Sequence, residues 1–147
     1  MLFLITVAVI LASAQAKFYT DCGSKLATIQ KVEISGCAEE AKECILRRNT
    51  NVSIAIDFTP TVDAKNLETV VHGIIMNLPF PFPLPQPDAC KDSGLVCPIK
   101  SGEKVSYKSS MPILKSYPKV KVDVKWELKN DDEEDLICVI IGAKLTK

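Results

Sequence analysis

The chain of 147 residues has little of what most enzymes and nucleic-acid-binding proteins need. It contains a single histidine, His72, so any site with two imidazole ligands, including that of the common zinc proteases, is excluded. The 18 Lys and Arg residues equal the 18 Asp and Glu residues, and no long basic run is present. Because such a chain cannot neutralise many phosphates, we expect no nucleic-acid binding. No G-x-S-x-G motif occurs, and no serine or cysteine motif surrounds His72, so we expect no enzyme and read His72 as structural.

Long apolar runs are missing after the first 16 residues, which carry no charge. Residues 2–11 are apolar but too short to cross a bilayer, and Ala14-Gln15-Ala16 has the small-x-small pattern of a cleavage site. We therefore predict a signal peptide at residues 1–16 and a secreted mature domain at residues 17–147. An uncleaved anchor is the alternative.

Six cysteines are present, and in an exported domain of this size they are expected to form three disulfides. Six cysteines allow 15 pairings, and the sequence alone does not choose among them. The spacing favours two short loops and one bond between the chain ends, namely Cys37–Cys44, Cys90–Cys97 and Cys22–Cys138. No C-x-x-C pair occurs, so neither a metal nor another cofactor is expected.

Alternation of apolar and polar residues dominates the mature chain and predicts β-strands. The clearest cases are residues 120–128, 52–58 and 137–145; weaker ones are residues 29–34, 67–76, 103–110 and 44–47. Only residues 38–44 have a helical tendency, and that segment is too short to form a stable helix alone. The pattern predicts an all-β fold, an immunoglobulin-like sandwich of about seven antiparallel strands.

Three further segments carry signals of their own. Asn51-Val52-Ser53 is an N-glycosylation acceptor. Residues 79–87 hold five prolines and cannot form a central strand, so Phe80 and Phe82 are expected either in the wall of a pocket or core or on an exposed docking surface. Residues 131–135 are all acidic but lack the spacing of a calcium loop, which predicts a solvated hairpin tip.

Short motifs spread over the mature chain resemble the ML lipid-recognition domain family, and within it the soluble sterol carriers. These are Asp21-Cys22-Gly23-Ser24, Val70-Val71-His72-Gly73-Ile74, Pro81-Phe82-Pro83 with the run through Asp88 to Cys90-Lys91, Cys97-Pro98-Ile99, Ser106-Tyr107, Ser116-Tyr117-Pro118 and Trp126. The resemblance implies a seven-stranded sandwich whose sheets part to form an apolar ligand cavity. It also implies the disulfide pairing favoured above and no catalytic activity.

The resemblance also implies where a ligand binds. Phe82, Ile113 and Tyr117 fall on positions that line the sterol tunnel and its mouth, and Trp126 falls on an aromatic of its wall. Other lining positions fall on Phe80, Val32, Ile34, Leu46, Ile54, Pro112, Val122 and Val124. From alternation alone, most of these residues would be ordinary core.

Two aromatics of the sterol carriers are replaced here, by Val52 and Val139. The change favours a flexible aliphatic ligand, such as a fatty acid or a small hydrophobic signal molecule, over a strict sterol preference. Arthropods hold many members of the family, and we expect this chain to be one of them.

The sequence thus predicts a monomeric lipid-binding and transfer protein that carries a sterol or fatty acid between membranes, with transient membrane contact. A membrane-bound sterol transporter or receptor would be its acceptor, and the protein would be extracellular or in the lysosome lumen. The alternatives are a lipid-recognition accessory protein of innate immunity and a chemosensory carrier.

Overall fold

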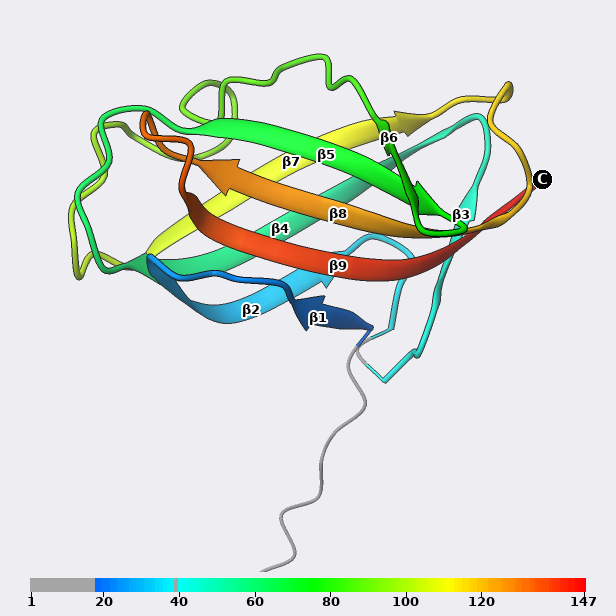
Figure 1. The fold of residues 1–147 in the computed structure, drawn as a ribbon, viewed down its shortest axis with the longest axis horizontal. Coiled ribbons are helices and arrows are strands. Elements are labelled where there is room, and N and C mark those ends of the chain that lie inside the picture. Colours follow the sequence, from blue (N-terminus) through cyan, green and yellow to red (C-terminus); the bar gives the residue numbers. More distant parts are fainter. Residues whose placement is uncertain (1–17, 39) are drawn as a thin grey trace, which may run out of the picture.

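Two β-sheets packed face to face form the fold in the computed structural model, which describes residues 18–38 and 40–147 (Figure 1). The predicted signal peptide lies outside the described residues. The first sheet has the order β1 (Tyr19–Asp21), β9 (Asp135–Thr146), β8 (Lys121–Lys129), β5 (Glu68–Ile75) and β6 (Leu78–Pro81), with β3 (Cys44–Arg47) beside β9. The second has the order β2 (Ala27–Ile34), β4 (Thr50–Pro60) and β7 (Val105–Ile113). None of the described residues forms a helix able to cross a membrane.

The seven strands expected from alternation are all present, and the all-β sandwich is confirmed. β1 and β6 are additional, and the segment with a helical tendency contains no helix in the residues that the structure describes. One pairing differs from the antiparallel expectation, because β3 runs parallel to β9. The four-residue β3 is too short for alternation to reveal its partner, which lies about a hundred residues further along the chain.

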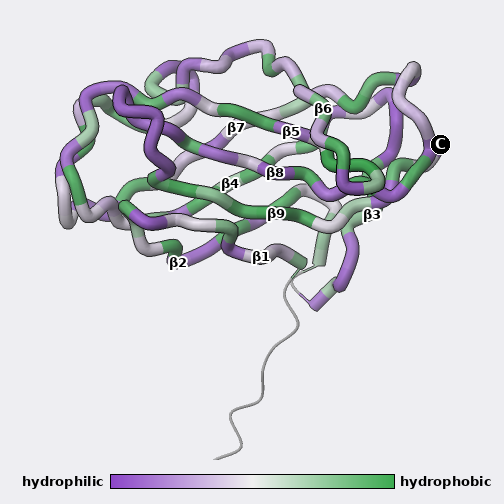
Figure 2. Tube along the Cα trace, in the orientation of Figure 1, coloured by the Kyte–Doolittle hydropathy of each residue, from purple (hydrophilic) through white to green (hydrophobic). Residues whose placement is uncertain are grey.

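Inward-facing side chains of both sheets form one hydrophobic core. On β8 the buried residues Val122, Val124, Trp126 and Leu128 alternate with polar ones, and β4 buries Ile54, Ile56 and Phe58 in the same way. Figure 2 shows this alternation of hydrophobic and hydrophilic residues along the strands. Because strands such as β4 and β8 bury every second residue, the two inner faces meet as a largely apolar layer.

The disulfide pairing is confirmed as Cys22–Cys138, Cys37–Cys44 and Cys90–Cys97. Cys37 follows β2 of one sheet and Cys44 begins β3 of the other, so this bond joins the two sheets at one edge of the sandwich.

The proline-rich segment begins as β6, an edge strand. Pro79 and Pro81 pair in register with Ile74 and His72 of β5, and the other side of β6 has no partner strand. An edge strand tolerates prolines because their missing N–H groups can face solvent. Phe82 directly follows β6, and its backbone N–H still donates to the Val71 carbonyl of β5, so its ring lies next to Gly73 on the inner face of that strand.

Candidate functional site

An apolar cavity lies between the two sheets, and residues from six strands line it. They are Ile34, Leu46, Val52, Ile54, Met111, Val124, Trp126 and Ile141. Five of these eight, Ile34, Leu46, Ile54, Val124 and Trp126, are among the predicted ligand-binding residues. The other three, Val52, Met111 and Ile141, were not predicted to bind the ligand, although Val52 stands at the position of a sterol-carrier aromatic, Ile141 belongs to an alternating face and Met111 lies one residue beyond a predicted strand.

The volume of this interior cavity is about 20 Å³. A cavity of that size holds about one water molecule, whereas ligand sites usually measure about 300–1,000 Å³. A lipid therefore fits only if the sheets separate or the lining side chains move. Met111 is the most adaptable of the lining residues, because its unbranched thioether has several rotatable bonds.

Phe82 and Tyr117 meet at the edge of the sandwich where β5 and β7 lie opposite each other. Their ring centroids are 5.2 Å apart with an interplanar angle of 68°, an edge-to-face contact. Phe82 follows β6 of one sheet and Tyr117 follows β7 of the other, so the pair spans the two sheets. We call these two residues the mouth pair.

Gly73 of β5 makes room for the mouth pair. A Cβ atom at Gly73 would fall well inside van der Waals contact of the Phe82 ring. The backbone N–H of Phe82 also donates to the carbonyl of Val71 at 2.9 Å, which holds the segment against β5. The absence of a side chain at Gly73 thus lets the aromatic ring pack directly against the strand.

Arg48 holds the other half of the mouth. Its Nη1 donates to the carbonyl oxygens of Lys115 at 2.8 Å and Tyr117 at 3.1 Å. These two bonds fix the loop between β7 and β8 on which Tyr117 sits. The sequence did not predict this role of Arg48, because its hydrogen-bond partners are backbone carbonyls distant along the chain, and no sequence motif reports such contacts.

The remaining predicted ligand-binding residues do not line the interior cavity. Val32, Ile113 and Val122 are buried in the core, and Pro112 is half-buried on β7. Phe80 lies on β6 with 49% of its surface exposed, close to Met76 and Leu78, which are 89% and 61% exposed. The proline-rich segment thus divides its aromatics between an exposed surface and the mouth pair.

A buried polar pair lies beside Trp126, one of the cavity-lining residues. The hydroxyl groups of Thr69 and Tyr107 lie 2.9 Å apart and share a hydrogen bond, and both residues are almost fully buried. Burial raises the pKa of the Tyr107 hydroxyl, although nearby hydrogen-bonding groups on Thr69, Ser109 and Trp126 act in the opposite direction. Tyr107 is therefore protonated at physiological pH, and its hydroxyl hydrogen is available for the bond with Thr69.

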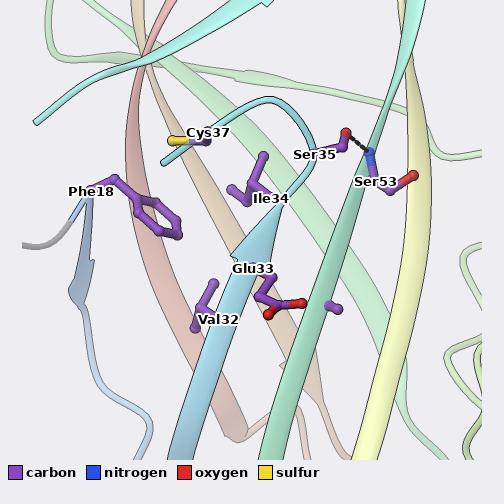
Figure 3. Close-up of a pocket in the computed structure, with 8 residues that line it drawn as sticks. Phe18, Val32, Glu33, Ile34, Ser35, Cys37 and Ser53 are labelled. Carbon is purple, nitrogen blue, oxygen red and sulfur yellow. Dashed lines mark hydrogen bonds between the residues drawn. The ribbon is translucent and has the colours of Figure 1, made fainter. Parts of the chain in front are cut away.

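A second, open groove of about 360 Å³ lies at the end of β2 (Figure 3). Phe18, Val32, Ile34 and Cys37 lie on one side of it, and Glu33, Ser35 and Ser53 lie on the other, with the Ser53 N–H donating to the Ser35 hydroxyl at 2.9 Å. Ile34 lines both the groove and the interior cavity.

One titratable cluster lies on the outer face of the first sheet. Donor atoms of Glu127, Asp135 and Cys138 lie within 4.8 Å of one another, but the Cys138 sulfur belongs to a disulfide and is not a thiolate ligand. Lys129 Nζ lies 3.2 Å from Glu127 and 3.3 Å from Asp135. Burial and the adjacent Glu127 raise the pKa of Asp135; burial opposes ionisation of Glu127 as well, but hydrogen bonds from Asp135 and Lys129 lower its pKa. The ion pairs of Lys129 with Glu127 and Asp135 account for this cluster without a metal ion.

Comparison with known proteins agrees with this geometry. The family model described as ML domain matches residues 16–145. The chain is 65% identical over 145 residues to the ecdysteroid-regulated 16 kDa protein of Manduca sexta, covering 99% of each chain. It is 48% identical over 141 residues to NPC intracellular cholesterol transporter 2 homolog a of Drosophila melanogaster, covering 96% of this chain and 95% of that protein.

Among solved structures, a Niemann-Pick type C2 protein from Japanese carpenter ant is similar, with a TM-score of 0.82 and 34% identity over 87% of this chain and 98% of the other. The chain therefore belongs to the ML domain family, whose lipid-binding members are not enzymes.

Proposed function

We propose that the protein binds an elongated lipid, a fatty acid or a sterol, between its two sheets and carries it between membranes or to a protein acceptor without chemical change. The observation that carries this proposal is the interior cavity, whose eight lining side chains are all predominantly apolar and come from both sheets. Two relatives named as cholesterol transporter and Niemann-Pick type C2 protein support it.

The affinity expected for such a cavity suits a carrier. Each buried CH₂ group of a ligand contributes about 0.8 kcal/mol, so ten such groups contribute about 8 kcal/mol, which corresponds to micromolar affinity before ordering costs. Part of this energy is used to widen the cavity from its closed volume. The resulting complex holds a lipid in water and still releases it to a membrane.

Entry and release would occur at the mouth pair. The two rings meet through an aromatic contact, which is worth about 0.5–1.5 kcal/mol beyond its buried area. Separating them costs far less than breaking the strand pairing within either sheet. A small movement of Phe82 and of the Arg48-held loop therefore admits the ligand.

The exposed apolar residues beside the mouth would contact the membrane. Met76, in the turn between β5 and β6, and Leu78 and Phe80, on β6, are exposed, and Leu114, in the loop that carries Tyr117, is 46% exposed. Exposed apolar patches of this kind mark contact surfaces, and insertion of these side chains into a bilayer would bring the mouth to the lipid. The proposal includes export through the predicted signal peptide, to the extracellular space or the lysosome lumen, and a glycan at Asn51, which is exposed on β4.

Transfer of a fluorescent sterol and a fluorescent fatty acid between vesicles tests the proposal. We expect the mature chain, residues 17–147, to bind at least one probe saturably and to accelerate its transfer. A cavity-filling variant, Val52→Phe, should weaken binding, whereas Val70→Phe, on the outer face of β5, should not. The proposal fails if the wild-type chain neither binds nor moves either probe. Binding without transfer would instead favour the accessory or chemosensory alternative.

A further inference from the structure

The interior cavity and the open groove at the end of β2 meet at one buried residue. Ile34 lines both spaces, so it belongs to the core and also to the wall of the groove. Neither residue of the mouth pair, in contrast, is among the eight described residues that line the interior cavity. The cavity therefore borders the groove through Ile34, on the side of the sandwich away from the mouth pair.

The groove already has the volume of a ligand site, which the interior cavity lacks. It measures about 360 Å³, against about 20 Å³ for the cavity, and small-molecule sites usually measure about 300–1,000 Å³. A lipid confined to the cavity must gain all of its space by separating the sheets. A lipid that extends past Ile34 into the groove finds part of its space preformed, and a preformed site costs less to occupy.

The walls of the groove suit one end of a lipid. Phe18, Val32 and Ile34 are apolar and lie on one side, whereas the hydroxyl groups of Ser35 and Ser53 lie on the other (Figure 3). The groove also lies beside the disulfide between the end of β2 and the start of β3, which joins the two sheets there. A hydrocarbon chain can thus pack on one wall of a covalently braced groove, while a polar group at its end meets hydroxyls or water.

We propose that the groove is an outer part of the ligand site and holds one end of an unbranched lipid that is too long for the interior cavity. This inference rests on the proposed function and extends the binding site past Ile34 to the surface. The groove and the mouth pair then lie at opposite edges of the second sheet, since β2 and β7 are its outer strands and β4 lies between them.

The groove would make the protein selective for chain length. A short chain that ends inside the cavity gains nothing from the groove, whereas a longer chain gains with every methylene group that packs on the apolar wall. Each methylene group removed from water raises the affinity by about fourfold.

Two substitutions at Ser35 test the inference. Ser35 is exposed and lines the groove but not the interior cavity, and its hydroxyl accepts the N–H of Ser53. Ser35→Trp loses this bond and fills the groove, whereas Ser35→Ala loses the bond alone and is the matched control. Partition of radiolabelled eicosanol, a long unbranched alcohol, and of the shorter lauryl alcohol between vesicles and the mature chain measures binding.

We expect Ser35→Trp to weaken the binding of eicosanol by at least about fourfold, the contribution of one buried methylene group, relative to wild type and to Ser35→Ala. Lauryl alcohol should bind all three proteins alike. The inference is overturned if Ser35→Trp weakens the binding of both alcohols equally or of neither.

A second measurement uses the wild-type chain alone and so does not depend on how well a variant folds. Phe18 and Cys37 line the groove, but neither lines the interior cavity or adjoins a lining residue in the sequence. Eicosanol should move the amide resonances of both residues in the ¹⁵N-labelled mature chain, and unmoved resonances at saturation would overturn the inference. If the wild-type chain binds neither alcohol nor either fluorescent probe, the proposed function itself fails, which is a different result.

Discussion

Substitution of Gly73 by alanine should loosen the mouth of the cavity. Gly73 lies in the middle of β5, paired with Val124 of β8 and Phe80 of β6, so its backbone is held on both sides. The new methyl group would overlap the Phe82 ring, whose Cε2, Cζ and Cδ2 atoms are its nearest neighbours. The ring, which is only partly buried, moves more easily than the strand. Displacement of Phe82 then breaks its contact with Tyr117.

The size of the effect follows from the contacts that are lost. The aromatic pair is worth about 0.5–1.5 kcal/mol, and exposing part of the Phe82 side chain costs about 1 kcal/mol more. Replacing a strand glycine normally gains about 0.4–1 kcal/mol through the unfolded state, so the net loss of folding stability is about 1 kcal/mol. Because the ring contact must break for the ligand to leave, its loss should speed release by about 2- to 12-fold.

Stopped-flow fluorescence measures this release, with excess vesicles trapping a fluorescent fatty acid from the preloaded protein. Gly142→Ala is the matched control, since a methyl group there would meet its nearest atoms, the Lys42 carbonyl and an Asp123 oxygen, at 3.6 and 3.9 Å. Urea denaturation of both variants separates a change in release from a change in stability. If Gly73→Ala releases ligand at the wild-type rate and is more stable than wild type, the ring does not guard the cavity.

Three other perturbations have defined outcomes. Arg48→Ala removes two hydrogen bonds to the loop between β7 and β8, so it should also speed lipid release, with Arg48→Lys in between; an unchanged rate would show that the loop is held by other contacts. Burial and Glu127 raise the pKa of Asp135 in the folded protein, so ionisation of this carboxyl lowers the folding stability once the pH exceeds the pKa of the unfolded chain. Asp135→Asn should therefore stabilise the protein near neutral pH and lose this advantage toward about pH 4. Equal urea midpoints for variant and wild type at both pH values would contradict this. Replacing Cys22 and Cys138 by alanine opens a loop with a sequence separation of 116 residues and should cost about 5 kcal/mol on the chain-entropy model, measured by the same denaturation; a loss under about 2 kcal/mol would refute that model here.

Alternation predicts the sandwich well because it reports directly which side of a strand is buried. Residues 120–128 and 52–58 correspond to β8 and β4 within two residues, since both strands carry apolar side chains on one face and polar ones on the other. β6 was not predicted, because alternate prolines lack the N–H groups that strand pairing needs. The pairing of β6 with β5 is possible only because β6 lies at the edge of its sheet. β3 was expected as a strand, but its parallel partner is set by tertiary structure.

The cavity was less predictable than the fold. Val122 and Val124 are neighbours on the same face of β8, yet only Val124 lines the interior cavity. Which inward residues border a cavity depends on the local separation of the sheets, and alternation does not encode that distance. Likewise Phe80 and Phe82 differ by two residues, but the chain leaves β6 between them, so that one ring stays exposed and the other packs on Gly73.

The two edges of the sandwich are joined by different kinds of interaction, and this has an evolutionary consequence. Cys37–Cys44 links the sheets covalently at one edge, while Phe82 and Tyr117 meet through ring contact at the other. On the proposed function, the residues that hold the sheets together covalently are therefore separate from the residues at which a ligand would enter. Duplicated copies of such a gene are free to diverge in the ligand that they carry, because changes at the mouth leave the disulfide framework intact.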